Sequence, residues 1–228
     1  MNPKTPIKNL LVLLACVILA MAYAGTMNRA NAQGAPAQLL VTWQADTYVP
    51  DGFSGKVMPA SDSQIVMGVD LINLGKRVDL SKYNIFWYVN ENFYQGTVGL
   101  ARISLAAPHI IGENSITIRV LIKNYGSGIG KTITIPMVVP EVVIQSSAPS
   151  LAASAAPFNL QAYPYFFNVQ NASQLSFEWS LNGVSVGNQN PFVATKEMAN
   201  RKSSRIELSL RNPAKPIERI TQGLTIFK

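Results

Sequence analysis

The 228-residue chain has very few of the side chains that usually bind metals or act as nucleophiles. It contains one cysteine, Cys16, and one histidine, His109. A zinc site needs three or four such ligands, and a Cys–His pair needs both residue types close together. A Ser–His–acid triad would have to use His109, which no G-x-S-x-G segment accompanies. The twelve acidic residues form neither a calcium-loop pattern nor an evident glycosidase pair. The sequence therefore predicts a protein that is not an enzyme and has no metal or cofactor.

Long apolar runs are also scarce, and the longest lies near the N-terminus. Residues 10–25 form an uncharged run of 16 residues, LLVLLACVILAMAYAG. Basic residues precede it, and an A-x-A pattern at Ala30 and Ala32 follows it, directly before Gln33. This order is typical of a secretory signal peptide. We expect residues 1–32 to be a signal peptide that is removed after Ala32.

Two other interpretations of the N-terminus stay open. The apolar run is slightly shorter than the roughly 17–25 residues that span a bilayer, and it would serve as an anchor if it stayed uncleaved. Leu13-Leu14-Ala15-Cys16 also resembles a lipidation motif with Cys16 as the modified residue. All three interpretations predict export across the cytoplasmic membrane, to a secreted or envelope-associated location.

The mature chain would have no cysteine and only a modest charge. Only 14% of the residues are charged and 48% are hydrophobic, which excludes a disordered chain. Removal of residues 1–32 takes away Lys4, Lys8 and Arg29, so the basic residues fall from 19 to 16 and the net charge becomes 16 − 12 = +4. A charge of this size does not indicate a nucleic-acid partner. Without disulfides, an exported protein must be stabilised by burial of its core.

A repeated pattern indicates two copies of one small domain. Residues 83–90 read YNIFWYVN, and residues 175–182 read LSFEWSLN. In each segment every second residue is apolar, which is the period of a β-strand with one face on a core. The alternation places Trp87 and Trp179 on the buried face. We expect both indoles to be central core residues.

The regions around this motif match as well. The alternating segments SITIRVLIK at 115–123 and RIELSLR at 205–211 follow at similar distances, and each is followed by a turn and a final strand. Earlier strands are expected in pairs at 39–43 and 142–144, and at 64–72 and 158–163. Short strands, turn residues and a buried Trp point to an all-β chain of sandwich domains. We predict that residues 33–140 form the first domain and residues 141–228 the second.

The repeat also resembles a known family. The x-W-x-x-N pattern, the segment NSITI at 114–118 and the final strand of each copy resemble bacterial Ig-like modules of the PKD-like kind. The segment WQADTYVP at 43–50, with Gly55-Lys56 after it, resembles part of uncharacterised exported proteins of small-genome bacteria. The resemblance covers nearly all of residues 33–228. It implies two tandem Ig-like β-sandwiches with a structural or adhesive role and no catalytic residues.

The outward faces of the two Trp strands differ. In the second copy this face carries Ser and Glu side chains, whereas in the first copy it carries four large aromatic residues on the strand and in the next turn: Phe86, Tyr88, Phe93 and Tyr94. These rings must be solvated, covered by the long loop at 46–61, packed on the other domain or reserved for a partner. They form the candidate contact face.

These observations favour a non-catalytic envelope or surface module that contacts a protein or a glycan, or that acts as a structural spacer. One alternative is an accessory subunit of an envelope or pilus-type assembly that acts by β-strand pairing. Another is a carbohydrate-binding accessory domain. The expected partner is an unknown protein or glycan at the cell surface, and the chain would contact the membrane only through an uncleaved N-terminal segment.

Overall fold

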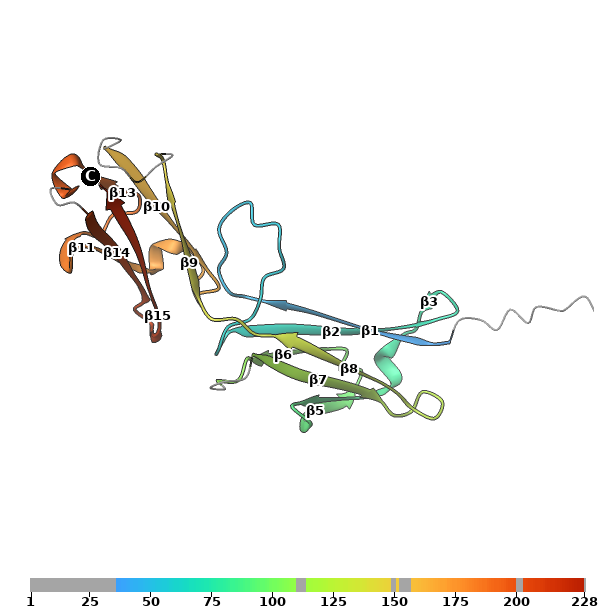
Figure 1. Ribbon diagram of the computed structural model, residues 1–228. Helices are drawn as coiled ribbons and strands as arrows, with labels where there is room; N and C mark the ends of the chain where they lie inside the picture. Colours follow the sequence, from blue (N-terminus) through green and yellow to red (C-terminus); the bar gives the residue numbers. More distant parts are fainter. Residues whose placement is uncertain (1–35, 110–113, 149–150, 152–156, 200–202, 228) are drawn as a thin grey trace, which may run out of the picture.

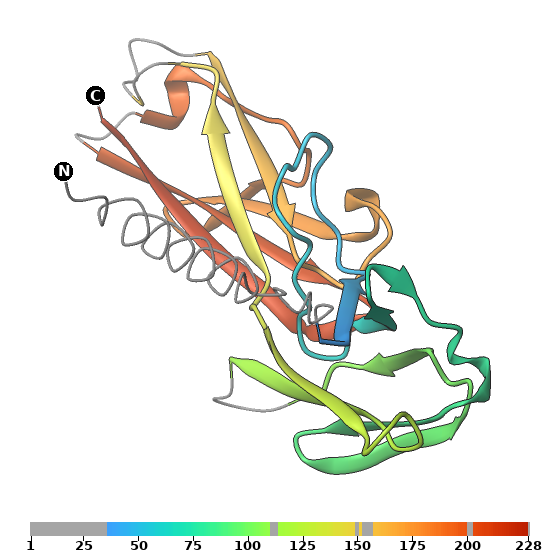
Figure 2. The ribbon, with the colours of Figure 1, turned by 90° about the vertical axis from the view of Figure 1, so that its right-hand side faces the viewer.

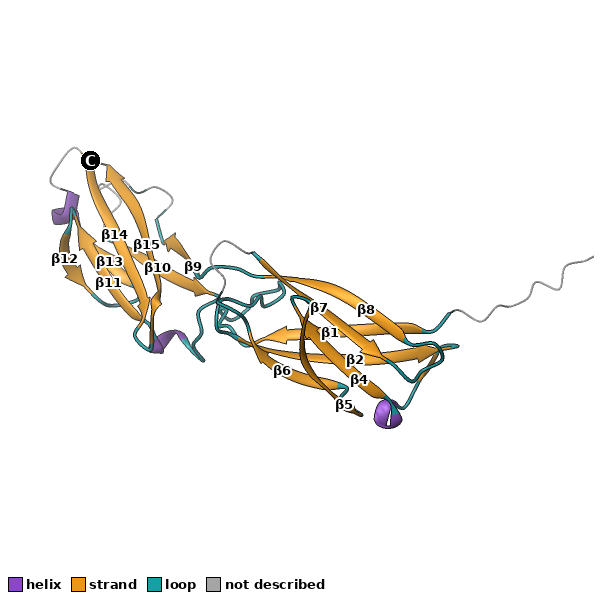
Figure 3. Cartoon of the chain, turned by 90° about the horizontal axis from the view of Figure 1, so that it is seen from below, coloured by secondary structure: helices purple, strands orange, loops and turns teal. Residues whose placement is uncertain are grey.

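The structure is a computed structural model that describes residues 36–109, 114–148, 151, 157–199 and 203–227. In this part of the chain the helical elements are 3-10 turns of three or four residues, and all other regular elements are strands (Figure 3). The signal peptide predicted for residues 1–32, its cleavage residues Ala30, Ala32 and Gln33, and Cys16 lie outside the described residues. Within residues 36–227, as far as they are described, no helix has the length and hydrophobicity to cross a bilayer.

The first domain consists of two facing sheets. Its elements are β1 Gln38–Ala45, β2 Gln64–Asn73, β3 Lys76–Arg77, η1 Leu80–Lys82, β4 Asn84–Val89, β5 Asn92–Val98, β6 Arg102–Ala106, β7 Ser115–Ile122 and β8 Ile129–Pro136. One sheet has the order β1-β2-β3, with β6 also paired to β2, and the other has the order β5-β4-β7-β8. All pairs within these sheets are antiparallel.

The second domain repeats this arrangement without the short β3 strand. Its elements are β9 Glu141–Ser146, β10 Phe158–Tyr165, η3 Ala172–Gln174, β11 Ser176–Leu181, β12 Val184–Gly187, β13 Phe192–Ala194, η4 Lys196–Ala199, β14 Ser203–Asn212 and β15 Lys215–Phe227. The sheets have the orders β13-β10-β9 and β12-β11-β14-β15. In both domains the chain crosses between the sheets more than once, which is the Greek-key connection of Ig-like sandwiches. The structure confirms an all-β fold of two tandem Ig-like β-sandwiches (Figure 1).

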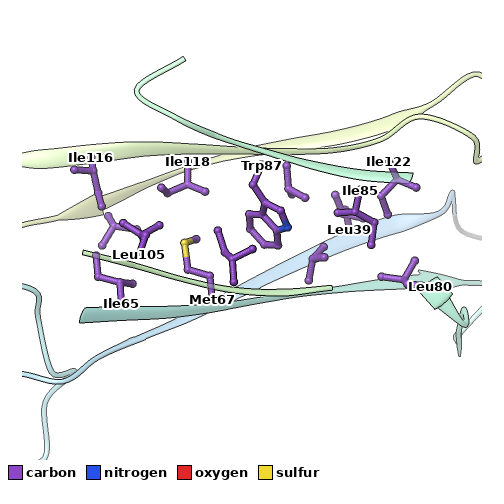
Figure 4. Packing of buried hydrophobic residues seen from close by; sticks show 14 of the residues in the cluster. Leu39, Ile65, Met67, Leu80, Ile85, Trp87, Leu105, Ile116, Ile118 and Ile122 are labelled. Atoms are coloured by element: carbon purple, nitrogen blue, oxygen red, sulfur yellow. The ribbon is translucent and has the colours of Figure 1, made fainter. Parts of the chain in front are cut away.

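Each domain has its own hydrophobic core with a tryptophan at its centre. Trp87 and Trp179 are both fully buried, each within a separate cluster of apolar side chains. Figure 4 shows side chains of both sheets of the first domain meeting around Trp87. Alternate residues of β7 and β14 point into these clusters, so the period of two that is visible in the sequence corresponds to burial on one face. Burial of each large apolar side chain contributes roughly 1.5–3 kcal/mol.

The repeated tryptophans also make the same hydrogen bond. The indole N–H of Trp87 donates to the carbonyl oxygen of Leu100 at 2.9 Å, and that of Trp179 donates to the carbonyl oxygen of Gln189 at 2.9 Å. Each ring therefore buries its apolar body in the core and pairs its polar atom with the chain that leads to the opposite sheet. Directly after each tryptophan the edge strand contains a β-bulge, in which Tyr94 of β5 and Val186 of β12 are the extra residues.

The repeated asparagine has a structural role as well. Asn90 and Asn182 adopt positive φ angles of 46° and 50° and begin the two-residue turns that connect β4 to β5 and β11 to β12. The side-chain oxygen of Asn90 accepts the backbone N–H of Thr117 at 2.9 Å, and that of Asn182 accepts the backbone N–H of Arg205 at 3.0 Å. Asparagine is suited to this position because it tolerates the left-handed conformation and its amide reaches a nearby backbone group. The W-x-x-N pattern thus combines a core ring with a capped turn.

A long loop of the first domain contacts the second domain. We call residues 46–61 the strap. The strap extends from β1 beside β9 and β10 in both views (Figures 1 and 2). Tyr48 forms an isolated antiparallel bridge with Phe167, with backbone hydrogen bonds of 2.7 and 2.8 Å at Phe166 and Phe167. The ring of Phe53 packs against Tyr165 and Phe166, with centroid distances of 5.9 and 6.1 Å.

A buried polar group holds the end of the strap. The side-chain N–H of Asn168 donates to the carbonyl oxygen of Ser61 at 2.8 Å and also to the carboxylate of Glu218. Glu218 is almost completely buried, and its carboxylate also accepts the side-chain N–H of Asn212 at 2.8 Å. The ammonium of Lys215 donates to the carbonyl oxygen of Asp62 at 3.0 Å. These bonds tie the second domain to the first at a position separate from the chain connection between β8 and β9.

Candidate interaction surface

The predicted contact residues lie on the sheet β5-β4-β7-β8 of the first domain. Ile85 and Trp87 of β4 point into the core, so Phe86 and Tyr88 point to the opposite face. Both of these rings are half-buried. On the edge strand β5, Phe93 is 61% exposed and Tyr94 is 44% exposed. The open sheet face therefore carries large aromatic groups at several positions.

The structure brings three of the four predicted residues together with two cations. The ring of Phe93 lies 5.9 Å from that of Tyr88 and 6.5 Å from that of Phe86. The guanidinium carbon of Arg119 lies 4.1 Å from the centroid of Tyr88, and the ammonium of Lys123 lies 4.6 Å from the centroid of Phe86. Such cation–π contacts contribute about 0.5–1 kcal/mol at exposed sites. We call Phe86, Tyr88, Phe93, Arg119 and Lys123 the aromatic face.

The position of Phe86 depends on the glycine opposite it. Phe86 pairs with Gly96 of β5, and a Cβ atom built on Gly96 would lie 2.5 Å from the Phe86 ring. No side chain fits at that distance, so the Phe86 ring occupies the space that a side chain at position 96 would take. This explains why an outward-facing phenylalanine is half-buried although no other domain covers it in the described contacts.

Tyr94 is separate from the aromatic face. The bulge in β5 falls next to it, and its hydroxyl donates to the carbonyl oxygen of Ser104 on β6 at 2.9 Å. Tyr94 thus connects the edges of the two sheets. It closes one side of the sandwich and does not join the cluster around Phe93.

Arg119 and Lys123 are the residues of this surface that the sequence prediction did not select. Their outward orientation follows from the alternation within β7. Their contact with the rings depends on the pairing of β4 with β7, which places Arg119 directly opposite Tyr88. In the sequence, an argument about strand register based on the two Trp segments would have been the only signal for these contacts.

The loop that was considered as a cover for the rings has a different partner. The strap places Phe53 against Tyr165 and Phe166 of the second domain. The rings of the aromatic face are covered in part by their own sheet, through Arg119, Lys123 and Gly96. Phe93 keeps most of its surface in solvent.

His109 and the acidic residues do not form a catalytic or metal site in the described part of the chain. His109 is exposed, and its Nδ1 lies 3.9 Å from a carboxylate oxygen of Asp62. Among the described residues, no group of three or more His, Cys, Asp or Glu side chains is arranged to hold a metal ion. Among the described residues, this contact with Asp62 is the one polar contact of His109 in the structure, and it is long and lies at the surface.

Comparison with known proteins adds solved structures with low sequence identity. No family model and no curated protein sequence matches the chain. Three N-terminal domains of the bacteriophage RB49 outer capsid protein Hoc share 13% identity and a TM-score of 0.47, over 83% of this chain and 59% of that one. Fibronectin(III)-like modules of Clostridium thermocellum CbhA share 10% identity and a TM-score of 0.29, over 82% of this chain and 93% of that one. A chimeric titin Z1Z2 shares 11% identity and a TM-score of 0.33, over 83% of this chain and 95% of that one. The description of this chain as tandem Ig-like domains rests on its own strand order and its two cores.

Proposed function

We propose that the protein is an exported, non-catalytic module that binds a partner protein through the aromatic face of its first domain. The observation that supports this most directly is Phe93, which is 61% exposed while it contacts Tyr88 and Phe86. Tyrosine and arginine are enriched among the residues that contribute most to protein–protein binding, and contiguous exposed apolar groups mark such surfaces. Arg119 supplies the charged component beside these rings.

The orientation of the rings favours a protein over a glycan. A sugar ring lies flat on an aromatic side chain, so a row that binds a glycan needs rings of similar orientation. Here the ring of Phe93 is inclined by 74° to Tyr88 and by 51° to Phe86. Inclined rings form a rough apolar surface that suits the varied side chains of a protein.

The test compares variants of the two domains as baits. Full-length protein with Phe93→Ser and Arg119→Ser would be immobilised beside wild type, and proteins captured from envelope extract would be quantified by mass spectrometry. We expect the captured partner to fall roughly tenfold, because loss of interface residues of this kind costs more than about 1 kcal/mol each. The matched control is Glu178→Ser with Glu207→Ser on the equivalent face of the second domain, which should capture as wild type does. Equal capture by both variants would contradict the proposal.

Strand pairing is a second candidate because of the exposed edge β5. Six of its seven residues are exposed, and the sequence NFYQGTV contains neither a charged residue nor proline. Edges of this kind accept an added strand unless they are blocked. Gln95→Lys with Thr97→Lys, two exposed positions that do not share the sheet face of Phe86, should abolish capture if the partner pairs with β5. These changes should have little effect if the partner binds the aromatic face.

Export is supported by the sequence of residues 1–32 and is tested separately. The intact mass of protein recovered from cells distinguishes the three interpretations. A mature chain that begins at Gln33 indicates cleavage, the full mass indicates an anchor, and a lipid adduct at Cys16 indicates lipidation. Recovery of the unprocessed, unmodified chain from the soluble cytoplasmic fraction would contradict export.

The strap supports an additional role as a stiff spacer. Its bridge from Tyr48 to Phe167 and the bond from Asn168 to Ser61 give the two domains contacts beyond their single connection. Phe53→Ala with Asn168→Ala should loosen the junction. Spin labels on the two domains should show a narrow distance distribution in wild type and a broad one in the variant. A broad distribution in wild type would contradict a spacer role.

A further inference from the structure

A cleft lies between the strap and the outer face of strands β9 and β10. Its volume is about 470 Å³, which is within the usual range of roughly 300–1,000 Å³ for sites that bind small molecules. Such sites are common at domain interfaces. The side chains that define its chemistry are Asp51 and Phe53 from the strap and Val143, Gln145, Tyr163 and Tyr165 from the second domain. The cleft is separate from the aromatic face, and nothing in the proposed function uses it.

Aromatic groups form much of the wall of this cleft. Phe53 meets Tyr165 at 5.9 Å with an interplanar angle of 62°, and it meets Phe166 at 6.1 Å with an angle of 84°. Tyr163 precedes Tyr165 by two residues on β10 and therefore shares its face of the sheet. Rings inclined steeply to one another present their π faces from several directions. This is the arrangement in which aromatic cages enclose alkylated ammonium groups.

The charge of the cleft is negative. Among the described residues that line it, Asp51 is the one acidic residue, and none is basic. Glu141 adds a second carboxylate near the rim, because it stands directly opposite Tyr165 in the register of β9 and β10. The cation of the strap, Lys56, is turned elsewhere, with its ammonium 3.5 Å from the ring centroid of Trp43.

The pKa of the neighbouring Tyr48 also reflects the negative charge of Asp51. The pKa of Tyr48 lies above its ordinary value, first because burial disfavours the phenolate and then because Asp51 and Tyr165 are close to its hydroxyl. Both effects oppose a further negative charge at this end of the strap. The carboxylate of Asp51 would repel an anionic ligand and attract a cation, whereas burial disfavours a charge of either sign.

Both walls of the cleft are held in place. Tyr48 is bonded through its backbone to Phe166 and Phe167, which directly follow Tyr165 on the chain. At the other end of the strap, Ser61 is bonded to Asn168. A ligand therefore finds a preformed site and does not have to order a loose loop, which would weaken binding.

We propose that this cleft binds a small organic cation with an alkylated ammonium group, of the choline class. Such a cation combines an apolar surface, which fits Phe53, Tyr163 and Tyr165, with a positive charge, which the carboxylate of Asp51 balances. The π faces of the rings attract the charge even though it is spread over methyl groups that donate no strong hydrogen bond.

The experiment compares choline with its uncharged isostere 3,3-dimethyl-1-butanol, which has the same shape. Full-length protein would be titrated with each by calorimetry and by NMR of the tyrosine ring signals. Choline should bind saturably and roughly tenfold or more tightly than the isostere. The Asp51→Asn variant should remove most of that preference. The control Glu178→Gln, which makes the same change of charge on the opposite sheet of the second domain, should bind choline as wild type does.

A second variant protects the test against loss of the strap. Phe53→Ala could release the strap and would then remove the cleft together with the ring. Tyr163→Leu keeps an apolar side chain on the rigid strand β10 and removes one π face, so it should weaken choline roughly fivefold or more and leave the isostere nearly unchanged. The proposal is overturned if wild type binds neither ligand, if both ligands bind equally, or if Asp51→Asn keeps the full preference for choline. None of these outcomes affects the proposal for the aromatic face, because its residues lie on the first domain away from the cleft.

Discussion

The two domains have the same arrangement of core residues and differ on one outer face. Both place a tryptophan at the centre of the core and donate its indole N–H to a carbonyl oxygen at 2.9 Å. Both have a bulge in the edge strand beside it and, three residues later, an asparagine whose side chain accepts a backbone N–H of the other neighbouring strand. These features establish the sandwich and its turns. In both copies the Trp and the Asn of the motif therefore have the same structural roles.

The outer face at the same positions has different chemistry in the two domains. In the first domain Tyr88 stands opposite Arg119, and in the second domain Ser180 stands opposite Glu207. The position of Phe86 is taken by Glu178, which is exposed. The outer face of the first domain is aromatic and cationic, whereas that of the second domain is polar and carries Arg205 and Arg211 as well as its glutamates. Because both faces occur on the same framework, folding does not determine their chemistry. The difference therefore directs attention to the first domain as the one with a specialised surface.

The strongest way to break the similarity is to remove one core tryptophan. Trp87→Ala or Trp179→Ala should destabilise its own domain by about 3–5 kcal/mol, because a large ring leaves a cavity and its carbonyl partner loses a donor. Calorimetry of the full-length protein should show one transition at lower temperature, while the transition of the other domain stays near its wild-type position. Trp43→Ala is the control, since that ring is only partly buried at the border of the first core, and it should cost clearly less. A wild-type melting curve for either core variant would show that the indole is not central.

The capped turns offer a smaller and more selective test. Asn90→Ala or Asn182→Ala should cost about 1–3 kcal/mol, because a backbone N–H of the adjacent strand loses its acceptor and alanine is strained at positive φ. The matched variants Asn90→Gly and Asn182→Gly also lose the acceptor, but glycine adopts positive φ without strain. Their loss of stability should therefore be only about 1 kcal/mol. Urea unfolding would measure the four values. If the glycine and alanine variants are equally stable, the backbone angle has no part in selecting asparagine.

The smallest expected effect concerns the side-chain caps of the short helices η1 and η3, which precede the two Trp strands. Asp79 accepts the backbone N–H of Ser81 at 2.9 Å, and this bond is the main reason that the pKa of its carboxyl lies below the ordinary value. In the second domain the side-chain oxygen of Gln174 accepts the backbone N–H of Gln170 and Asn171, and an amide does not titrate in this range. The first domain should therefore have a pH-dependent cap and the second should not.

The sign of this dependence follows from the lowered pKa. The carboxylate of Asp79 stabilises the first domain above the unfolded-state pKa of about 4, and that contribution disappears as the pH falls through the lower pKa of the folded state. Asp79→Asn should lower the melting temperature slightly at pH 6, and the difference from wild type should vanish toward pH 2. Gln174→Ala should give a difference that does not change over the same range. A pH-independent effect of Asp79→Asn would rule out the charged cap.

The sequence predicted the elements in which burial alternates strictly. Residues 83–90, 115–123, 175–182 and 205–211 have one wholly apolar face, and the structure forms β4, β7, β11 and β14 there. The final strand expected after each of the two turns also forms, as β8 and as β15, which begins at Lys215. Alternation was sufficient because a core covers one side of each of these strands.

The elements that were missed have weaker local signals. Strand β5 is exposed on both sides, so its residues do not alternate, and β13 has only three residues. The strap was recognised only as a loop, because its partner Phe167 lies 119 residues after Tyr48 and no local pattern links them. Of the contact residues, Phe86 and Tyr88 followed from the period of β4. The separation of Tyr94 depends on a bulge that the sequence does not announce.

The contact between Lys56 and Trp43 has a consequence for spectroscopy. Trp87 and Trp179 are sealed inside the two cores, whereas Trp43 is partly accessible and has an ammonium 3.5 Å above its ring. An anionic quencher such as iodide is drawn to that ammonium and reaches this indole alone. Because Lys56 belongs to the strap, the quenchable share of the fluorescence rises and falls with the seating of the strap on the sandwich. Iodide quenching of Trp43 fluorescence thus measures how firmly the strap joins the two domains.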